Sequence, residues 1–350
     1  MRRLPILFLV VASCAASVRL GSIASEEGND EPRDASATLG DGALGDGATT
    51  DGPRPTAADA AVDANVDAGP LLTLATDMAG AEWIAVGADH VTWTTSGRTG
   101  DAGDLNGHYV ANKDGSNRVQ IKSEPGILRG VVVDGTTFNA LRWISPVSII
   151  ERASATSSQS PHVTGFFLEG YGLAADGTSL FAAATTKVVS ISRTSDAGAA
   201  TELLASFVKA VALTSDGDQL FVADQGLESI VRVDKATGNV VWSWPIGGAI
   251  NDVATDATRV YFAGGGRAGH VLKTAQQLTL FDLPGANALA VDTSGIYYAS
   301  ATAILRADFA DPSVTTTLAS GFVSLGRIAL DADFIYFTDR GSGSVYRLRK

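Results

Sequence analysis

Short apolar segments separated by polar turns recur along the chain from about residue 80 to the C-terminus. In each copy a short apolar run is followed by a turn rich in Asp, Gly, Ser and Thr, and then by a second run that contains aromatic residues, as in "VALTSDGDQLFVAD". Short apolar runs bounded by turn residues predict β-strands, and stretches with helical periodicity and capping residues are absent. The body of the chain is therefore predicted to be all-β.

The pattern is an internal repeat with seven copies. When the copies are aligned on the residue that follows the first run, the successive spacings are 47, 42, 40, 40, 36 and 39 residues. A period of about 40 residues is typical of a four-stranded propeller blade. The aligned anchor residues are Gly87, Asp134, Asp176, Asp216, Asp256, Asp292 and Asp331. An Asp at such a turn accepts hydrogen bonds from its own backbone amides, so we expect these residues to be structural.

The two ends of the repeat region complement one another. The last copy stops after its third strand, at Lys350, and "PLLTLAT" (residues 70–76) precedes the first copy as a leftover fourth strand. Pairing of these two pieces would complete the last blade and protect the edges that an open array exposes. We therefore predict one domain over residues 70–350, a seven-bladed β-propeller closed by residues 70–76 pairing with the C-terminal blade.

Two of the copies resemble known propeller repeats. "GDQLFVADQGLESIVRVDKATG" is similar to NHL and YVTN repeats. "IALDADFIYFTDRGSGSVYRL" resembles a YWTD repeat, with Tyr336, Phe337, Thr338 and Asp339 in place of the namesake tetrad. The resemblance covers residues 70–350 and implies a bacterial β-propeller. It implies little about function, because propellers include hydrolases, lyases, oxidoreductases and many binding modules.

The N-terminus has the pattern of an export signal. Two arginines precede a nine-residue apolar segment (residues 4–12), which is shorter than the roughly 20 residues of a membrane span. The segment ends in "VASC", which resembles the lipobox of bacterial lipoproteins. The resemblance implies a signal peptide over residues 1–13, lipidation of Cys14 and, because Ala15 follows the cysteine, an outer-membrane lipoprotein. The alternative is a signal cleaved near Ala16 and a secreted or periplasmic protein.

Residues 14–69 are predicted to form a disordered linker between the lipid and the propeller. Within it, residues 22–69 hold eleven acidic residues, two basic residues and no aromatic residue. Such a segment cannot bury enough apolar surface to offset the chain entropy lost on folding. Repulsion between its like charges extends it, so we expect a flexible acidic tether.

Composition narrows the classes of partner. The chain has 350 residues, of which 45% are hydrophobic, an ordinary value for a globular protein, and its net charge is −12. This charge argues against nucleic acid and anionic membrane surfaces as partners. The single cysteine excludes an intrachain disulfide and a Cys-rich zinc site. We expect a monomer that touches the membrane only through its lipid anchor and whose partner is an envelope or extracellular protein, a peptide or a glycan.

Large polar residues concentrate at one position of the repeat, two residues before the first strand, and in two copies at the residue that follows this position. In a propeller these positions edge the central channel at one face, where groups distant in sequence converge on a small volume. We predict that they line a ligand pocket, and the alternative is a solvated rim. The predicted residues are Glu82, Arg129, Tyr171, Lys209, Asn251, Asp252, Asn287 and Arg327. Their mixed charges suit a polar, zwitterionic or sugar-like ligand better than a bare metal ion.

Catalytic motifs are missing from the sequence. There is no G-x-S-x-G elbow, and the four histidines (His90, His108, His162 and His270) fall at different places in their repeats, so we expect no catalytic triad. The favoured hypothesis is a binding module that is not an enzyme and needs no cofactor.

The second hypothesis is a propeller enzyme of the lactonase or lyase type with a divalent metal in the central channel. Glu82, Asn251 and Asn287 are of the residue types that gluconolactonase-like propellers use around such a metal. A calcium ion could also bind in an insertion of the first repeat, through Asp101, Asp104 and Asn106. The order of these ligands departs from that of an EF-hand, and an ordinary polar loop is the preferred interpretation.

Overall fold

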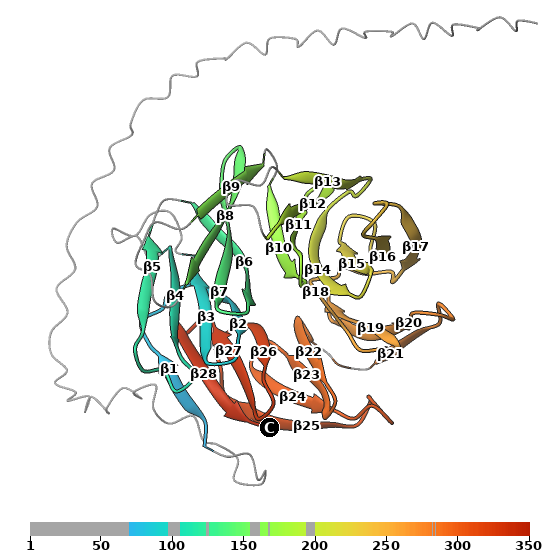
Figure 1. Cartoon of the computed structure of the whole chain (residues 1–350). Helices are drawn as coiled ribbons and strands as arrows, with labels where there is room; N and C mark the ends of the chain where they lie inside the picture. Colours follow the sequence, from blue (N-terminus) through green and yellow to red (C-terminus); the bar gives the residue numbers. More distant parts are fainter. Residues whose placement is uncertain are drawn as a thin grey trace, which may run out of the picture. The chain divides into compact units, whose positions relative to one another are not determined.

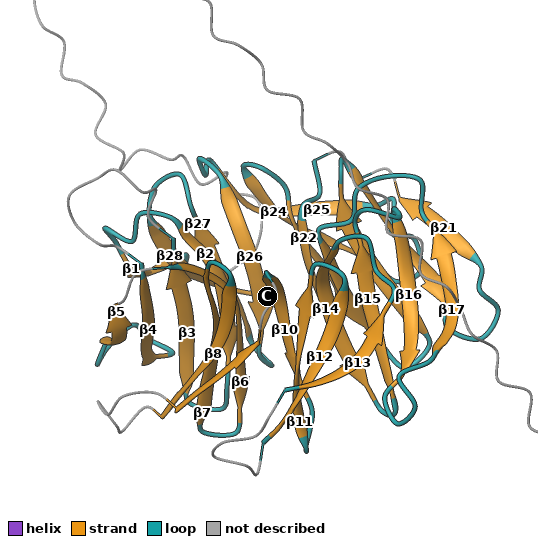
Figure 2. Ribbon diagram, turned by 90° about the horizontal axis from the view of Figure 1, so that it is seen from above, coloured by secondary structure: helices purple, strands orange, loops and turns teal. Residues whose placement is uncertain are grey.

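A computed structural model describes most of the chain from residue 70 onwards. The described residues are 70–96, 106–123, 126–154, 162–166, 169–193, 200–281, 283 and 285–350. They form seven four-stranded antiparallel sheets arranged around a common centre (Figure 1), so the domain is the predicted seven-bladed β-propeller. All its regular elements within these ranges are strands (Figure 2). Cys14, the signal peptide, the acidic tether, Asp101 and Asp104 lie outside the described residues.

The first six blades are each built from four consecutive strands that follow one another from the ring centre outwards. Blade 1 comprises β2 (Ala81–Val86), β3 (His90–Thr95), β4 (Gly107–Asn112) and β5 (Val119–Ser123), and blade 2 comprises β6 (Ile127–Asp134), β7 (Thr137–Ile144), β8 (Val147–Ser154) and β9 (His162–Phe166). Blade 3 comprises β10 (Gly170–Ala175), β11 (Ser179–Ala184), β12 (Lys187–Ser192) and β13 (Thr201–Ala205).

The next three blades follow the same plan. Blade 4 comprises β14 (Ala210–Asp216), β15 (Gln219–Asp224), β16 (Ser229–Asp234) and β17 (Val240–Pro245). Blade 5 comprises β18 (Asp252–Thr255), β19 (Arg259–Gly264), β20 (Arg267–Leu272) and β21 (Leu278–Phe281), and blade 6 comprises β22 (Ala288–Asp292), β23 (Gly295–Ala299), β24 (Ala303–Ala307) and β25 (Thr315–Ser320). Across the described residues, no helix is long and apolar enough to cross a bilayer.

Blade 7 joins the two ends of the propeller. Its inner strands are β26 (Leu325–Leu330), β27 (Phe334–Asp339) and β28 (Ser344–Arg349), and its outermost strand is β1 (Leu72–Ala75). β1 is antiparallel to β28, with Leu72 opposite Arg347. The inner strand β26 contacts β2 of blade 1, so the ring is continuous.

Apolar side chains fill the spaces between neighbouring blades. Between blades 4 and 5, for example, Phe221 and Trp242 pack with Phe262 in one buried cluster. The second strand of a blade is covered on both faces by its neighbours, which is why β15, β19, β23 and β27 read as continuous apolar runs rather than as alternating patterns. Each large side chain buried in this way stabilises the fold by about 1.5–3 kcal/mol.

The interface between blades 1 and 2 is different because much of it is polar. Its buried apolar cluster contains only Leu128, Val131 and Ala140. The buried polar side chains that β3, β4, β7 and β8 contribute here are Thr92, Thr94, His108, Arg142 and Glu151. Arg142 and Glu151 form a bidentate ion pair, with Nε–Oε1 and Nη2–Oε2 distances of 2.5 and 3.1 Å, and both side chains are fully buried.

His108 is the titratable group most affected by this environment. Its Nε2 lies 2.8 Å from the hydroxyl of Thr92. Burial, and secondly the positive charge of Arg142, lower the pKa of His108 from 6.5 to about 3. Between these two values the unfolded chain binds a proton that the folded protein does not. The stability linked to His108 is therefore complete above pH 6.5 and is lost as the pH falls towards 3.

We expect the substitution His108→Gln to weaken the acid sensitivity of the fold. In the wild type, proton uptake by His108 in the unfolded state lowers the free energy of unfolding by up to about 1.4 kcal/mol for each pH unit below pH 6.5. Glutamine cannot take up this proton, so the variant does not lose this stability. Urea unfolding of both proteins at pH 7, 5.5 and 4.5 measures this difference. The quantity compared is the slope of the free energy of unfolding against pH, so the result does not depend on any pH-independent effect of the substitution. Equal slopes would contradict the prediction.

Four of the six anchor aspartates cap their own turns as the sequence analysis expects, namely Asp176, Asp256, Asp292 and Asp331. For Asp134 and Asp216 the described residues give an ion pair with the next blade and no such cap. The Oδ1 atom of Asp176 accepts hydrogen bonds from the backbone N–H groups of Thr178 and Ser179. Its Oδ2 atom also lies 2.8 Å from Nζ of Lys235 in the next blade. Burial acts to raise the pKa of Asp176, but the bonds from Lys235 and from the turn outweigh it and hold the pKa at about 2.

The same ion pair between blades occurs at five of the seven interfaces within the described residues. The pairs are Asp134–Arg193, Asp176–Lys235, Asp216–Lys273, Asp292–Lys350 and Asp331–Lys113. In every pair the basic residue directly follows the third strand of its blade. These inter-blade pairs therefore join neighbouring blades at the end of the ring that carries the anchor residues. We call this end the anchor face.

Candidate functional site: a central pocket at the pocket face

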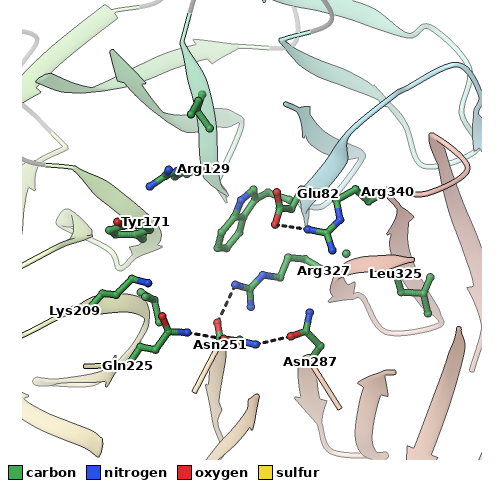
Figure 3. Close-up of a pocket in the computed structure, with 14 residues that line it drawn as sticks. Glu82, Arg129, Tyr171, Lys209, Gln225, Asn251, Asn287, Leu325, Arg327 and Arg340 are labelled. Atoms are coloured by element: carbon green, nitrogen blue, oxygen red, sulfur yellow. Dashed lines mark hydrogen bonds and ion pairs between the residues drawn. The ribbon is translucent and has the colours of Figure 1, made fainter. Parts of the chain in front are cut away.

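A cavity of about 520 Å³ opens where the inner strands begin, at the end of the ring opposite the anchor face. We call this end the pocket face. All seven blades contribute to the lining, and Figure 3 shows the polar side chains of these residues grouped around one central space. Seven of the eight predicted residues line it, namely Glu82, Arg129, Tyr171, Lys209, Asn251, Asn287 and Arg327. The volume falls within the roughly 300–1,000 Å³ typical of ligand pockets.

β-Bulges at the start of the inner strands direct several of these side chains into the cavity. The register with the second strand shifts at the beginning of the inner strand in blades 1, 2, 3, 4 and 7. A bulge leaves one or more residues without a partner and changes the direction of their side chains. The lining residues that lie within these shifts are Glu82, Arg129, Tyr171, Val211, Gly326 and Arg327.

In blades 4, 5 and 6 the predicted lining residue immediately precedes the inner strand. These residues are Lys209, Asn251 and Asn287. The two asparagines belong to a chain of amides: Nε2 of Gln225 donates to Oδ1 of Asn251 at 3.0 Å, and Nδ2 of Asn251 donates to Oδ1 of Asn287 at 2.5 Å (Figure 3). The lower wall of the pocket in this view is thus a row of amide groups.

Blade 7 has glycine where the other blades have a large side chain. A Cβ atom at Gly326 would meet the hydroxyl of Thr338 and the backbone of Glu82 in the neighbouring blade. The hydroxyl of Thr338 itself donates to the Glu82 carbonyl at 2.9 Å, so the two blades are in close contact at this point. Arg327, the next residue, supplies the side chain that blade 7 places in the pocket.

Three of the four cations in the lining have a carboxylate partner. Arg129 lies 2.6 Å from Glu169, Arg327 lies 2.9 Å from Asp252, and Arg340 lies 3.4 Å from Glu82. These are the Nη1–carboxylate distances. For Lys209, the fourth cation, the described residues place no carboxylate within ion-pair distance of its ammonium group. Of the four cations in the lining, Lys209 is therefore the one that no described carboxylate neutralises.

Asp252 is placed differently from the sequence prediction, because it does not line the cavity. Its Oδ1 atom pairs with Arg327, and its Oδ2 atom accepts the backbone N–H of Leu289 at 3.1 Å. The Arg327 guanidinium also donates to the carbonyl oxygen of Asn251 at 2.9 Å. Asp252 thus positions Arg327 across the channel and connects blades 5, 6 and 7, and its carboxylate is already occupied.

Cations lie over both aromatic rings of the pocket. The guanidinium carbon of Arg327 is 4.2 Å from the centroid of the Trp83 ring. Arg129 and Lys209 lie 4.5 and 5.8 Å from the centroid of the Tyr171 ring. Burial and the neighbouring carboxylate of Glu169 raise the pKa of the Tyr171 phenol, so it remains a neutral hydroxyl at physiological pH.

The residues of the pocket do not fit a divalent metal. A metal would need Glu82, Asn251 and Asn287 to turn free oxygen atoms towards one point, but Glu82 faces the Arg340 guanidinium and the two asparagines bond each other. In the part of the chain that the structure describes, no three His, Cys, Asp or Glu side chains are grouped so as to hold a metal ion. The lining also contains no histidine.

Several lining residues were not predicted from the sequence. They are Trp83, Ile127, Val211, Gln225, Leu325 and Arg340. Gln225 and Arg340 occupy the same place in their repeats, directly after the Asp that ends the second strand, in "ADQG" and "TDRG". A comparison of the copies at this second position would have identified both residues.

Comparison with known proteins shows the fold and leaves the family open. No protein-family model matches the chain, and no curated protein matches it in sequence. Among solved structures, it is similar to the WD40 β-propeller domain of Doa1 (TM-score 0.64, 12% identity, 81% of this chain and 96% of that chain). It is also similar to a chain of the mitotic checkpoint complex (TM-score 0.65, 12% identity, 86% and 98%).

An enzyme is among the similar structures as well. A catalytically inactive histidine-to-alanine variant of virginiamycin B lyase from Staphylococcus aureus, determined with quinupristin, has a TM-score of 0.63 and 15% identity, covering 80% of this chain and 98% of that chain. Identities this low show a shared β-propeller fold alone. A chain of a multiprotein complex and an enzyme both have folds similar to that of this chain, so the function has to be argued from the pocket.

Proposed function

We propose that the protein is a lipid-anchored binding module of the bacterial cell envelope whose central pocket holds a peptide segment of an envelope or extracellular protein. The observation that carries the proposal is the convergence of side chains from all seven blades on one cavity of about 520 Å³. The lining supplies a cation without a carboxylate partner, a row of amides and apolar side chains. This combination of a few placed polar groups on a preformed surface is typical of ligand sites.

Binding is favoured over catalysis by the chemistry of the lining. The carboxylates at the pocket, those of Glu82, Asp252 and Glu169, are each paired with an arginine, which leaves none of them free as a general base. In the similar lyase, replacement of one histidine gives a catalytically inactive protein. The pocket of this chain has no histidine in its lining, so that similarity gives little support to an enzyme of the lyase type.

A peptide is favoured over a glycan by the state of the two aromatic rings. Sugars commonly bind by stacking on an exposed aromatic face, and Tyr171 and Trp83 are the rings available in the pocket. Both rings already carry a guanidinium group, and these cations themselves line the cavity. A stacked sugar would have to displace the guanidinium groups and lose their cation–π contacts. Amides and a free cation instead match the backbone and charged groups of a peptide.

The location in the envelope is proposed on the sequence alone. Cys14 and the small residues before it resemble a lipobox, and the acidic segment 22–69 would act as the tether. Two lipid chains or more anchor a protein stably, at about 0.8 kcal/mol per buried CH₂ group. The outer membrane is the proposed membrane because Ala15, and not Asp, follows the cysteine.

Two sets of variants are expected to separate anchoring from binding. Cys14→Ser lacks the thiol that accepts the lipid, so it should move to the aqueous phase on detergent partition and still capture peptides. Arg129→Ala combined with Lys209→Ala should stay in the detergent phase and lose capture. The probe is a library of N-acetylated random hexapeptides offered to the immobilised full-length protein, with bound peptides identified by mass spectrometry. Both proteins should unfold within about 1 kcal/mol of wild type, as is usual for surface residues.

Arg349→Ala is the matched control, because it removes an exposed cation near the anchor face. It should capture peptides as wild type does. Capture of glycans from an array, with no capture of peptides, would overturn the choice of ligand. Equal capture by wild type and the double variant would show that the pocket is not the binding site.

A further inference from the structure

We infer that the pocket recognises the carboxyl terminus of a peptide chain whose last side chain is apolar, with the terminal carboxylate bound to Lys209. This inference rests on the proposed function and specifies its ligand. It depends on three features of blade 4 that lie close together in the chain or are joined by a backbone hydrogen bond: the Lys209 ammonium, an exposed apolar pair, and an amide oxygen that accepts no hydrogen bond from the described residues.

The first feature is the ammonium group of Lys209. Among the cations of the lining it is the one that faces no carboxylate in the described structure, and its side chain is directed towards the cavity beside Tyr171 (Figure 3). A half-buried cation without a counter-ion attracts an anionic ligand group strongly, because the ligand displaces no protein carboxylate when it binds. A carboxylate is the anionic group that every peptide chain carries at its end.

The Lys209 backbone is held in place before any ligand arrives. The fully buried carboxylate of Asp224 accepts the backbone N–H groups of Val208 and Lys209, each at 2.9 Å. The backbone N–H of Gln225 donates to the Lys209 carbonyl at 2.8 Å. A site fixed in this way loses little conformational freedom on binding.

The second feature is a pair of exposed apolar side chains close in the chain to the lining residues Lys209 and Gln225, although neither of the pair lines the cavity itself. Val208 and Leu227 are 55% and 49% exposed, although both are large aliphatic side chains. The Val208 side chain lies against Gly226, the residue before Leu227, because a Cβ atom at Gly226 would meet it. Val208 directly precedes Lys209, so the cation and the apolar pair are separated by a single residue step.

This spacing favours a chain terminus over an acidic side chain. In a terminal residue the carboxylate and the side chain are attached to the same Cα atom, so one residue can reach both Lys209 and Val208. An internal Asp or Glu would need a neighbouring residue to supply the apolar group. The third feature is Oε1 of Gln225. Nε2 of Gln225 donates to Asn251, and no described residue donates to Oε1, which can therefore accept the N–H of the terminal residue.

Blade 7 contains the same turn and shows why blade 4 is the binding blade. There Asp339 accepts the backbone N–H groups of Val323 and Ser324, as Asp224 does in blade 4. Burial acts to raise the pKa of Asp339, but these hydrogen bonds outweigh it and hold the pKa below its usual value. In blade 7, however, Ser324 stands in place of the lysine, and Arg340, the counterpart of Gln225, is paired with Glu82. That turn offers no free cation.

The test uses full-length protein and three hexapeptide libraries, all N-acetylated and random at the first five positions. The first library ends in Leu with a free carboxylate. The second is its C-terminally amidated twin, in which internal Asp and Glu remain as side-chain carboxylates. The third has a free carboxylate and ends in Ser. We expect wild type to retain the first library at least about tenfold better than the other two, which corresponds to one charge-assisted hydrogen bond or more.

Variants of blade 4 separate the features. Lys209→Met should reduce retention of the first library to that of the amidated twin, and Lys209→Arg should retain the preference for a free carboxylate. Leu227→Ser should reduce the preference for Leu over Ser at the last position and keep the preference for a free carboxylate. Thermal unfolding confirms that each variant is folded.

The possible failures are distinguishable. Equal retention of the first and second libraries would overturn the inference, because binding would then not depend on the terminal carboxylate, while the proposed peptide-binding function would stand. Equal retention by wild type and Lys209→Met would overturn the role of Lys209. Absence of any retained peptide would overturn both the inference and the proposed function.

Discussion

Deleting residues 22–78 is expected to prevent stable folding, whereas deleting residues 22–65 is expected to leave the melting temperature within about 3 °C of wild type, a shift that corresponds to ~1 kcal/mol. The longer deletion removes β1, which pairs with β28 as the outer strand of blade 7. It also removes Leu74 and Met78 from the buried cluster between blades 7 and 1. Loss of each large buried side chain costs about 2–5 kcal/mol, and the total stability of a domain is only about 5–15 kcal/mol.

The two deletions differ only in residues 66–78, so the comparison isolates the first strand. Far-UV circular dichroism and thermal unfolding of the purified proteins measure the effect. The exposed edge of β28 should also make the longer deletion prone to association, which size-exclusion chromatography detects. If both proteins melted at the same temperature, β1 would contribute nothing to ring closure and the structural account of blade 7 would be wrong.

The propeller could be predicted from the sequence because each blade repeats the same physical solution. The anchor turns, the aromatic second strands and a period of about 40 residues all derive from one four-stranded unit, so seven weak signals support one another. The polar interface between blades 1 and 2 could not be predicted. His108, Arg142 and Glu151 lie within ordinary strand patterns, and only the packing of two blades shows that they are buried together.

The position of the pocket could also be predicted from the sequence. Which of its side chains form ion pairs with one another could not. Residues at the start of the inner strands must surround the channel in any propeller, which is why Lys209 and Asn287 could be placed correctly. The partner of a side chain depends on how far it reaches across the ring. Arg327 meets Asp252 across 75 residues of sequence, and this contact removes Asp252 from the lining.

The inter-blade pairs of the anchor face show a pattern that the sequence does contain. Where the anchor is Gly87, which has no carboxylate, the residue after the third strand of the next blade is Ala155 and not a basic residue. After β24 of blade 6, Asp308 occupies this position, and the neighbouring anchor Asp256 bonds Tyr261 in its own blade instead. Both exceptions lack the cation, and the first lacks the carboxylate as well, so the described pairs are found only where one position carries the carboxylate and the other the cation.

Replacing Glu151 by Met is expected to destabilise the domain by about 3–5 kcal/mol. The substitution leaves the Arg142 guanidinium fully buried and without the carboxylate that balances its charge. Arg142→Met should cost a similar amount for the converse reason. It should also raise the pKa of His108 somewhat, since the charge of Arg142 is the second cause, after burial, of its low value.

The double variant Arg142→Met, Glu151→Met should recover most of the stability lost by either single change. It removes both buried charges at once and fills the space with apolar side chains of similar length, and such replacements of buried ion pairs are often neutral. Glu202→Met is the matched control, because Glu202 pairs with Lys187 across strands of blade 3 but is 55% exposed. We expect it to change stability by less than about 1 kcal/mol. Urea unfolding at pH 7 of the wild type, the two single variants and the double variant gives the coupling energy between Arg142 and Glu151. If the losses in free energy of unfolding of the two single variants simply add in the double variant, the two charges do not stabilise each other.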